Sequence, residues 1–143
     1  MNVKWILASK GTDVATIEPT ADIASAVRLL AARNIGALVV IDSSHQVAGI
    51  ISERDIIREL ADRGVETLQR PVGEVMTRKL VTCTRVDTIS TVMELMTAGR
   101  FRHLPVVERG QLIGIISIGD VVKHRLQEIE TESATLRDYI RNA

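Results

Sequence analysis

The sequence predicts an α/β protein, in the α+β sense, built from two copies of one strand-helix-strand-strand-helix unit. First, the residues from Gly49 to Asp55 return, with two changes, as the residues from Gly114 to Asp120. Second, β-branched runs alternate with stretches that have helical spacing. Third, 45% of the 143 residues are hydrophobic and only 2% aromatic, so aliphatic side chains must form the core. A duplication this long determines the architecture.

The duplication extends beyond that segment. Upstream of it, a constant shift aligns Ile23 with Ile89 and Leu38 with Leu104, and downstream the shift is one residue shorter. The lost residue falls in the polar turn between two strands, where a hairpin can absorb it without a change of register. We therefore expect the two copies to share one fold.

Periodicity and turn residues predict the elements of the first copy. Pro19 ends a short strand because proline cannot donate to a ladder. Asp22 is the expected N-cap of a helix whose apolar residues lie three and four apart. After an N-terminal segment over 1–13, the expected elements are strand 14–17, a helix from residue 22, strands 37–41 and 47–51, and a helix from Ser52 to near Gly64.

The second copy follows a linker over 63–74 and a short helix over 71–77. Its expected elements are strand 80–83, helix 87–98, strands 104–107 and 112–116, and a helix that starts at Ser117 and continues past Lys123. In the charged tail, an apolar stripe needs a partner surface, either the chain's own body or a second subunit; the stripe is Leu126, Ile129, Leu136 and Ile140. The expected division is 1–68 for the N-terminal segment and first repeat, 69–125 for the second repeat, and 126–143 for a C-terminal helix.

Composition disfavours several classes of function. Eighteen basic and eighteen acidic residues cancel, so no overall field attracts nucleic acid or an anionic membrane. Cys83 is the sole cysteine, and its alignment with Ile17 indicates a small buried hydrophobe rather than a redox or metal group. The apolar run 5–8 is too short for a signal peptide or a membrane span, so we expect a cytoplasmic protein. His45 and His124 are expected at the surface.

The order of these features resembles a tandem pair of cystathionine beta-synthase (CBS) domains, called a Bateman module. The features that carry the resemblance are the doubled Gly-apolar-apolar-Ser-x-x-Asp, the strand Leu104-Pro105-Val106-Val107, and Lys10-Gly11 followed by Val14 and Thr16-Ile17-Glu18-Pro19. The resemblance covers residues 8–125. It implies two βαββα repeats packed through their sheets about a pseudo-twofold axis, with two clefts between them. It also implies a homodimer and the binding of AMP, ADP, ATP or NAD as a regulatory signal, with AMP favoured and S-adenosylmethionine less favoured.

Asp55 and Asp120 are the candidate ribose ligands. A carboxylate in the first turn of a helix can accept hydrogen bonds from neighbouring ribose hydroxyls, and Ser52 and Ser117 stand one helical turn before these carboxylates. Each serine could cap its helix or meet a phosphate, since a helix N-terminus favours an anion. An ordinary capping box explains the same spacing, and capping and binding can coexist.

Basic residues make the two expected sites unequal. The first copy has Arg54 as a candidate phosphate partner, whereas the second copy has Gly119 at that place. The second copy instead has Arg102 and His103 before its strand, where the resemblance implies basic residues that reach phosphates. Lys10 is a further candidate for a phosphate contact. The alternative for Arg102 and Lys10 is a solvated surface side chain, and for His103 a structural role.

The adenine site is implied by the resemblance alone. Backbone groups near Thr16 and Ile17, and near Cys83 and Thr84, would read the edge of the base. The candidate walls are Ile17, Ala37, Val39 and Ile51, and Leu104 belongs to the same candidate set. Gly49 and Gly114 would let a ligand or a crossing strand approach the backbone closely.

These observations indicate a binding module rather than an enzyme. The sequence has no nucleophile with a neighbouring base, no glycine-rich phosphate loop and no paired metal-ligand histidines, so we expect neither a catalytic cofactor nor a metal. The predicted function is a regulatory adenine-nucleotide sensor of energy or redox state in signal transduction. The alternative is a dimerising scaffold with non-functional clefts, and nucleic-acid binding is a third and weaker choice.

Overall fold

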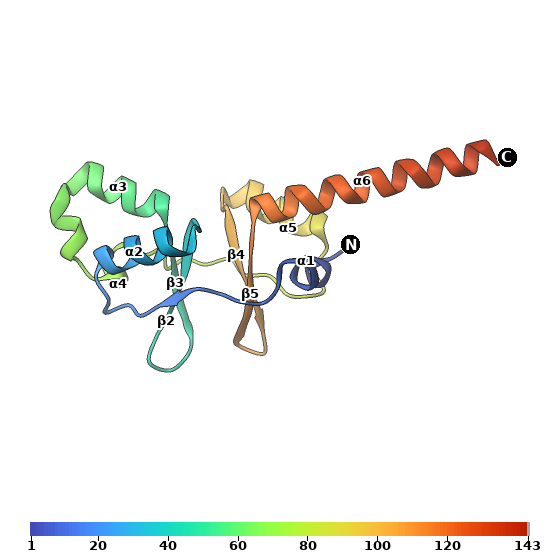
Figure 1. The fold of residues 1–143 in the computed structure, drawn as a ribbon. Helices are drawn as coiled ribbons and strands as arrows, with labels where there is room; N and C mark the ends of the chain where they lie inside the picture. The colour runs from blue at the N-terminus through green and yellow to red at the C-terminus, as the bar shows by residue number, and fades with distance from the viewer. Residues whose placement is uncertain (143) are drawn as a thin grey trace. The chain divides into compact units, whose positions relative to one another are not determined.

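The computed structural model describes residues 1–142 and folds into two compact units (Figure 1). The first-repeat unit is built on residues 13–81 with residues 109–112, and the second-repeat unit on residues 1–12, 82–108 and 113–142. Both units combine small sheets with helices, which confirms the predicted fold class.

A three-stranded sheet forms the centre of the first-repeat unit. Strand β1 (Thr16–Ile17) pairs in parallel with β2 (Ala37–Ile41), which pairs antiparallel with β3 (Val47–Ser52). Leu38, Val40 and Ile51 pack on one face of this sheet against helices α2 (Ile23–Arg33) and α3 (Glu53–Arg63). The cluster also contains Ile23, Ala26, Leu30 and Ile56. Strand alternation places Leu38 and Val40 on the helix-covered face and Val39 on the other.

The predicted boundaries of these helices are confirmed. Asp22 caps α2, since its carboxylate accepts a hydrogen bond from the Ser25 amide at 2.8 Å. Ser52 caps α3, and Gly64, whose φ of +80° favours glycine, follows its last residue, Arg63.

The predicted linker is structured and belongs to the first-repeat unit. It forms a 3-10 helix, η1 (Val65–Gln69), and a short helix, α4 (Val72–Val75). Arg70 fixes this segment to α3 through an ion pair with Glu59 at 2.7 Å.

The second-repeat unit contains α1 (Val3–Lys10), α5 (Ile89–Gly99), β4 (His103–Glu108), β5 (Gln111–Ser117) and α6 (Ile118–Arg141). The predicted strand over 80–83 is wrong, because only Cys83 makes a parallel bridge to Val106. The Cys83 amide donates to the Pro105 carbonyl at 3.0 Å, and the Val107 amide donates to the Cys83 carbonyl at 2.9 Å. One residue of pairing does not extend into a ladder.

Each sheet is crossed closely at its repeated glycine. A Cβ on Gly49 would lie 2.7 Å from both the Met76 sulfur and the Thr77 carbonyl oxygen, and a Cβ on Gly114 would lie 2.7 Å from Leu7. The close approach predicted for these glycines is therefore made by the chain's own segments. Because α1 packs in the second-repeat unit and residues 69–81 in the first, the units differ from the expected division at residue 68.

Helix α6 is continuous, so residues 126–142 extend the helix that begins after Ser117 rather than forming a separate one. Residue 143 lies outside the described residues. His124 is 7% exposed, which corrects its expected surface position; it shares the inward face of α6 with Val121, and its Nδ1 has no hydrogen-bond partner among residues 1–142. No helix within 1–142 has the length and hydropathy needed to cross a membrane.

Candidate functional site

The repeated motif forms the same local structure in both units. In the first-repeat unit, the Ser52 amide donates to Asp55 Oδ2 at 2.9 Å and the Asp55 amide donates to Ser52 Oγ at 3.3 Å. In the second, Ser117 and Asp120 make the same two bonds at 2.9 and 3.1 Å. The capping-box interpretation is thus confirmed for both copies. Each box also holds a half-buried carboxylate at a helix N-terminus.

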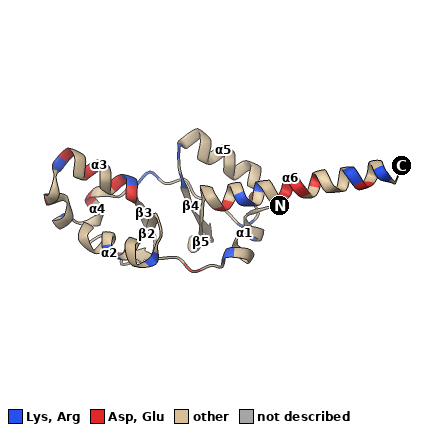
Figure 2. Ribbon diagram, turned by 45° about the horizontal axis from the view of Figure 1, so that its top comes forward, with Lys and Arg blue, Asp and Glu red and all other residues tan. Residues whose placement is uncertain are grey.

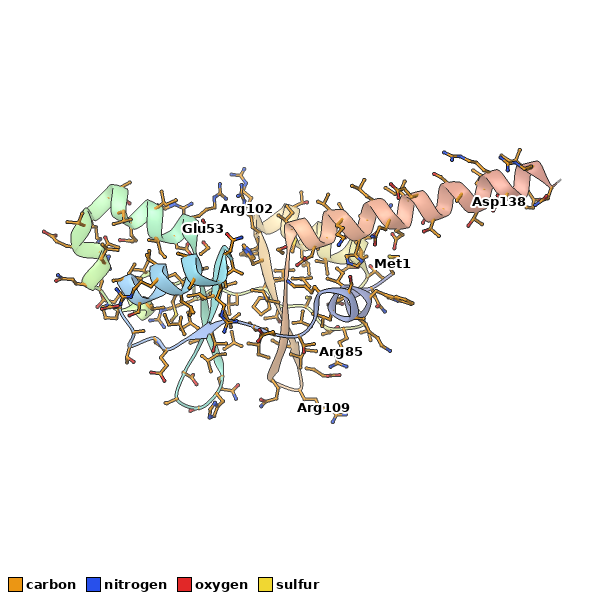
Figure 3. All side chains as sticks on the ribbon, viewed as in Figure 1. Met1, Glu53, Arg85, Arg102, Arg109 and Asp138 are labelled. Carbon is orange, nitrogen blue, oxygen red and sulfur yellow. The ribbon has the colours of Figure 1, made fainter. Side chains whose placement is uncertain are left out.

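The residues before β2 and β4 lie beside these helix starts. The Glu53 amide donates to the Gly36 carbonyl at 3.0 Å, and the Ile118 amide donates to the Arg102 carbonyl at 2.8 Å. This backbone bond brings Arg102 and the adjacent His103 to the N-terminus of α6 (Arg102 is labelled in Figure 3). The Arg102 side chain is exposed and that of His103 is half-buried.

Lys10 binds the carboxylate of the second repeat directly. Its Nζ lies 2.7 Å from Asp120 Oδ2 and also donates to the Ile115 carbonyl at 2.9 Å. Burial would raise the pKa of Asp120, but the hydrogen bond from Lys10, with those from Ser117, outweighs burial and holds the pKa below its ordinary value. Asp120 is therefore an anion at neutral pH, paired with Lys10 at a helix N-terminus that lies beside the backbone of Arg102.

The carboxylate of the first repeat has a different neighbour. Thr77 donates to Asp55 Oδ1 at 3.3 Å, and Arg54 is exposed on the first turn of α3. Thr77 was not among the predicted site residues. The repeat alignment could have found it, because Thr77 aligns with Gly11, next to Lys10, in the segment that precedes each repeat. The two motifs thus have a neutral donor in one unit and a cation in the other.

The residues predicted to recognise the adenine edge differ between the two units in their hydrogen bonds and exposure. Both backbone groups of Cys83 bond to β4, and the Thr84 amide donates to Asp87 at 2.8 Å. Burial, with a smaller effect of Asp87, raises the pKa of the Cys83 thiol to about 12, so the side chain is a neutral buried group. In the first-repeat unit, Thr16 is exposed and Ile17 half-buried.

Two of the other candidates are core residues. Ile51 is fully buried in the cluster beneath α2 and α3, and Leu104, at the position equivalent to Leu38, is also fully buried. The same strand positions thus pack inward in both units. Ala37 and Val39 are buried as well, on the sheet face opposite Leu38. Residues 1–142 contain no group of three metal-ligating side chains.

Comparison with known proteins assigns this architecture to a family. The family model described as "CBS domain" matches residues 10–62 and 72–127, which is most of the chain and both repeats. The chain belongs to the CBS domain family and is a tandem CBS pair.

Relatives and solved structures agree with this assignment. The mitochondrial CBS domain-containing protein CBSX3 of Arabidopsis thaliana is 40% identical over 119 residues, which are 80% of this chain and 58% of that protein. The solved CBS-domain protein ATU1752 of Agrobacterium tumefaciens is 48% identical, with a TM-score of 0.84 over 87% of this chain and 92% of that chain. The CBS pair of protein MJ0100, solved in complex with 5'-methylthioadenosine and S-adenosyl-L-methionine, is 25% identical with a TM-score of 0.79, over 90% of this chain and 98% of that one.

Proposed function

We propose that the second-repeat unit binds an adenosine-containing ligand at the N-terminus of α6. The observation that carries this proposal is the half-buried Asp120 carboxylate, held by its capping box and by Lys10 at a helix N-terminus beside the backbone of Arg102. Asp120 would accept hydrogen bonds from ribose hydroxyls, and the cations with the helix N-terminus would bind phosphate. The adenosine compounds bound by the MJ0100 pair support this chemistry.

The first-repeat unit would hold a second adenosine site, which would bind phosphate more weakly than the site in the second-repeat unit. Asp55 has the same position on its helix, but its neighbour from the preceding segment is Thr77 rather than a lysine. Arg54 is its candidate phosphate partner. Because the two ribose positions have different charges beside them, the two sites should prefer ligands with different numbers of phosphates.

The role that fits such a module is regulation by a ligand. The proposed order of ligands is AMP, then NAD or ATP and ADP, and the proposed signal is the energy or redox state of the cell. The proposed role is binding without a catalytic step, and the one cysteine, Cys83, is a buried neutral thiol.

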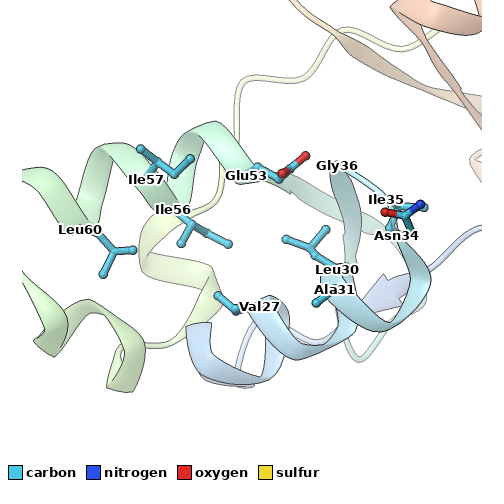
Figure 4. A pocket seen from close by; sticks show the side chains of 10 residues that line it. All are labelled: Val27, Leu30, Ala31, Asn34, Ile35, Gly36, Glu53, Ile56, Ile57 and Leu60. Carbon is cyan, nitrogen blue, oxygen red and sulfur yellow. The ribbon is translucent and has the colours of Figure 1, made fainter.

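Self-association is the second part of the proposal, because an apolar groove lies between α2 and α3 (Figure 4). It has a volume of about 470 Å³ and includes the exposed side chains of Val27, Ile35 and Ile57. An apolar groove rimmed by a polar residue, here Glu53, is typical of a protein interface. A second copy of this chain is the proposed occupant, in a homodimer.

A thermal-shift titration of the full chain tests the ligand proposal. The ligands are AMP, ADP, ATP, NAD, S-adenosylmethionine and, as a control without adenine, GMP. A ligand that binds only the folded state raises stability by RT ln(1 + [L]/Kd). A saturable rise with an adenosine compound supports the proposal, whereas no rise with any of them favours the alternative of a scaffold without ligand.

A further inference from the structure

Helix α6 has an apolar stripe on the side away from its own unit. The stripe contains Val122, Leu126, Ile129, Leu136 and Ile140, which are between 42% and 66% exposed. These residues, with Ser133, follow the alternating three- and four-residue spacing of the a and d positions in a coiled coil. The second half of α6 extends beyond α1 and α5 (Figure 1), and among residues 129–142 only Ser133 is even half-buried.

The opposite face of the helix is already occupied. Val121 and His124, which are 1% and 7% exposed, pack toward the body of the second-repeat unit. Glu128 forms an ion pair with the amino group of Met1, with its Oε2 3.0 Å from the Met1 nitrogen. In heptad terms these are c and f positions, directly opposite the a and d stripe. The unit therefore leaves the whole stripe accessible to a partner helix.

The charges beside the stripe identify the partner and its direction. Acidic and basic residues follow each other in groups along α6 (Figure 2). In a parallel, in-register pair, each g residue faces the e residue five places further along in the other chain. Arg125 would then face Glu130 of the second copy, and Glu132 would face Arg137 of the second copy, so both pairs are attractive. In the single chain, Arg125 pairs with Glu128 of its own helix.

The antiparallel arrangement with full overlap is disfavoured by the same residues. It would place Glu130 opposite Glu130, Glu132 opposite Glu132, and Lys123 opposite Arg137. Ser133 gives a second reason, because a polar residue in the seam favours the register in which it meets its own copy, and the parallel pair provides that register.

We infer that α6 forms a parallel, in-register two-stranded coiled coil with α6 of a second copy of this chain. This inference deepens the proposed self-association by naming its element and direction, and it is independent of the groove between α2 and α3. The pair would join the second-repeat units of two chains at a seam that begins at Val122, two residues after Asp120.

Cysteine cross-linking tests the direction. In a Cys83→Ala background, Leu136→Cys places a thiol in the seam, and the matched control Asp138→Cys places it on the outer face of the same turn. Under mild oxidation of the full chain, we expect a covalent dimer from Leu136→Cys and little from Asp138→Cys. Equal yields, or no cross-link at a protein concentration where sedimentation shows a dimer, would overturn the inference.

A charge exchange tests the partner. Glu132→Arg and Arg137→Glu should each weaken the dimer on the order of tenfold, and the double variant should restore it, because the exchanged charges again face each other across chains. Residues five apart are not neighbours on one helix, so the rescue cannot arise within a chain. Failure of rescue, or a monomeric wild-type chain at every concentration, contradicts the pairing. Because no nucleotide is added, these outcomes are separate from those of the ligand titration.

Discussion

Substituting Asp120 by alanine separates binding from capping. The substitution removes the carboxylate that accepts hydrogen bonds from Lys10 at 2.7 Å and from the Ser117 amide at 2.9 Å. Without ligand, the loss of a helix cap costs about 0.5–2 kcal/mol, which is a decrease of several degrees in Tm. With ligand, the ribose would also lose charge-assisted hydrogen bonds worth about 1.5–3 kcal/mol.

That loss corresponds to an affinity about 10 to 150 times weaker. At a ligand concentration of about 100 times the wild-type Kd, the stabilisation by ligand at this site would fall from about 2.7 kcal/mol to between about 0.3 and 1.3 kcal/mol. Isothermal calorimetry with AMP measures the affinity directly, and thermal shift measures the change of stability in the same variant.

Asp22→Ala is the matched control. Asp22 also accepts a backbone hydrogen bond at a helix N-terminus, from Ser25 at 2.8 Å, but it starts α2 rather than a repeated motif. Its substitution should lower the Tm to a similar extent and leave the affinity for AMP unchanged. If Asp120→Ala binds AMP as tightly as Asp22→Ala does, the carboxylate is only a cap and the reasoning fails.

The remaining predictions concern single contacts. Lys10→Met should weaken the binding of AMP more than that of adenosine in calorimetry, because only AMP has a phosphate that Lys10 can contact. An equal loss of affinity for both ligands would contradict the phosphate contact. Because the pKa of Asp120 is lowered in the folded state, its contribution to stability is present above the ordinary value of 3.8 and is lost as the pH falls through the folded pKa. Lys10→Met should therefore make acid unfolding, followed by circular dichroism, depend less steeply on pH below about 3.8. Gly49→Ala should cost about 1–3 kcal/mol in chemical denaturation, since its Cβ meets a carbonyl oxygen, whereas Gly114→Ala should cost less because only a flexible leucine must move. Cys83 should react with a thiol reagent only at the rate of unfolding, and immediate reaction of the native chain would contradict its burial.

The repeat made most of the fold predictable. Hairpins, helix caps and the two-unit architecture depend on local patterns that occur twice, so each copy supports the other. The predicted strand over 80–83 failed because local β propensity does not determine whether a pairing extends beyond one bridge. The burial of His124 could not be seen either, because the tail of α6 is polar on average and the inward face involves only its first turns.

The candidate site was predicted in part. The Ser-x-x-Asp spacing correctly indicated which carboxylates and serines meet, since one helical turn fixes that geometry. The direction of side chains in the strands was harder to predict, and Ile51 and Leu104, two of the predicted ligand contacts, are both fully buried. The contacts of Lys10 and Thr77 depend on which segment crosses which sheet, and no local pattern in the sequence reports that.

These crossing segments differ in chemistry between the two copies. Both motifs keep the same glycine, serine and aspartate, and both sheets are crossed at the glycine by a segment that precedes a repeat. The crossing segment supplies Lys10 to Asp120 in one unit and Thr77 to Asp55 in the other. A cation lowers the free energy of an anion beside it far more than a hydroxyl does at the same distance. Exchanging these two side chains, by Lys10→Thr and Thr77→Lys in one chain, should therefore transfer the stronger phosphate preference from the second repeat to the first. Calorimetry in Asp55→Ala and Asp120→Ala backgrounds would assign each affinity to its unit. If the preference stays with the second repeat, Arg102 and His103 rather than the crossing segment determine it.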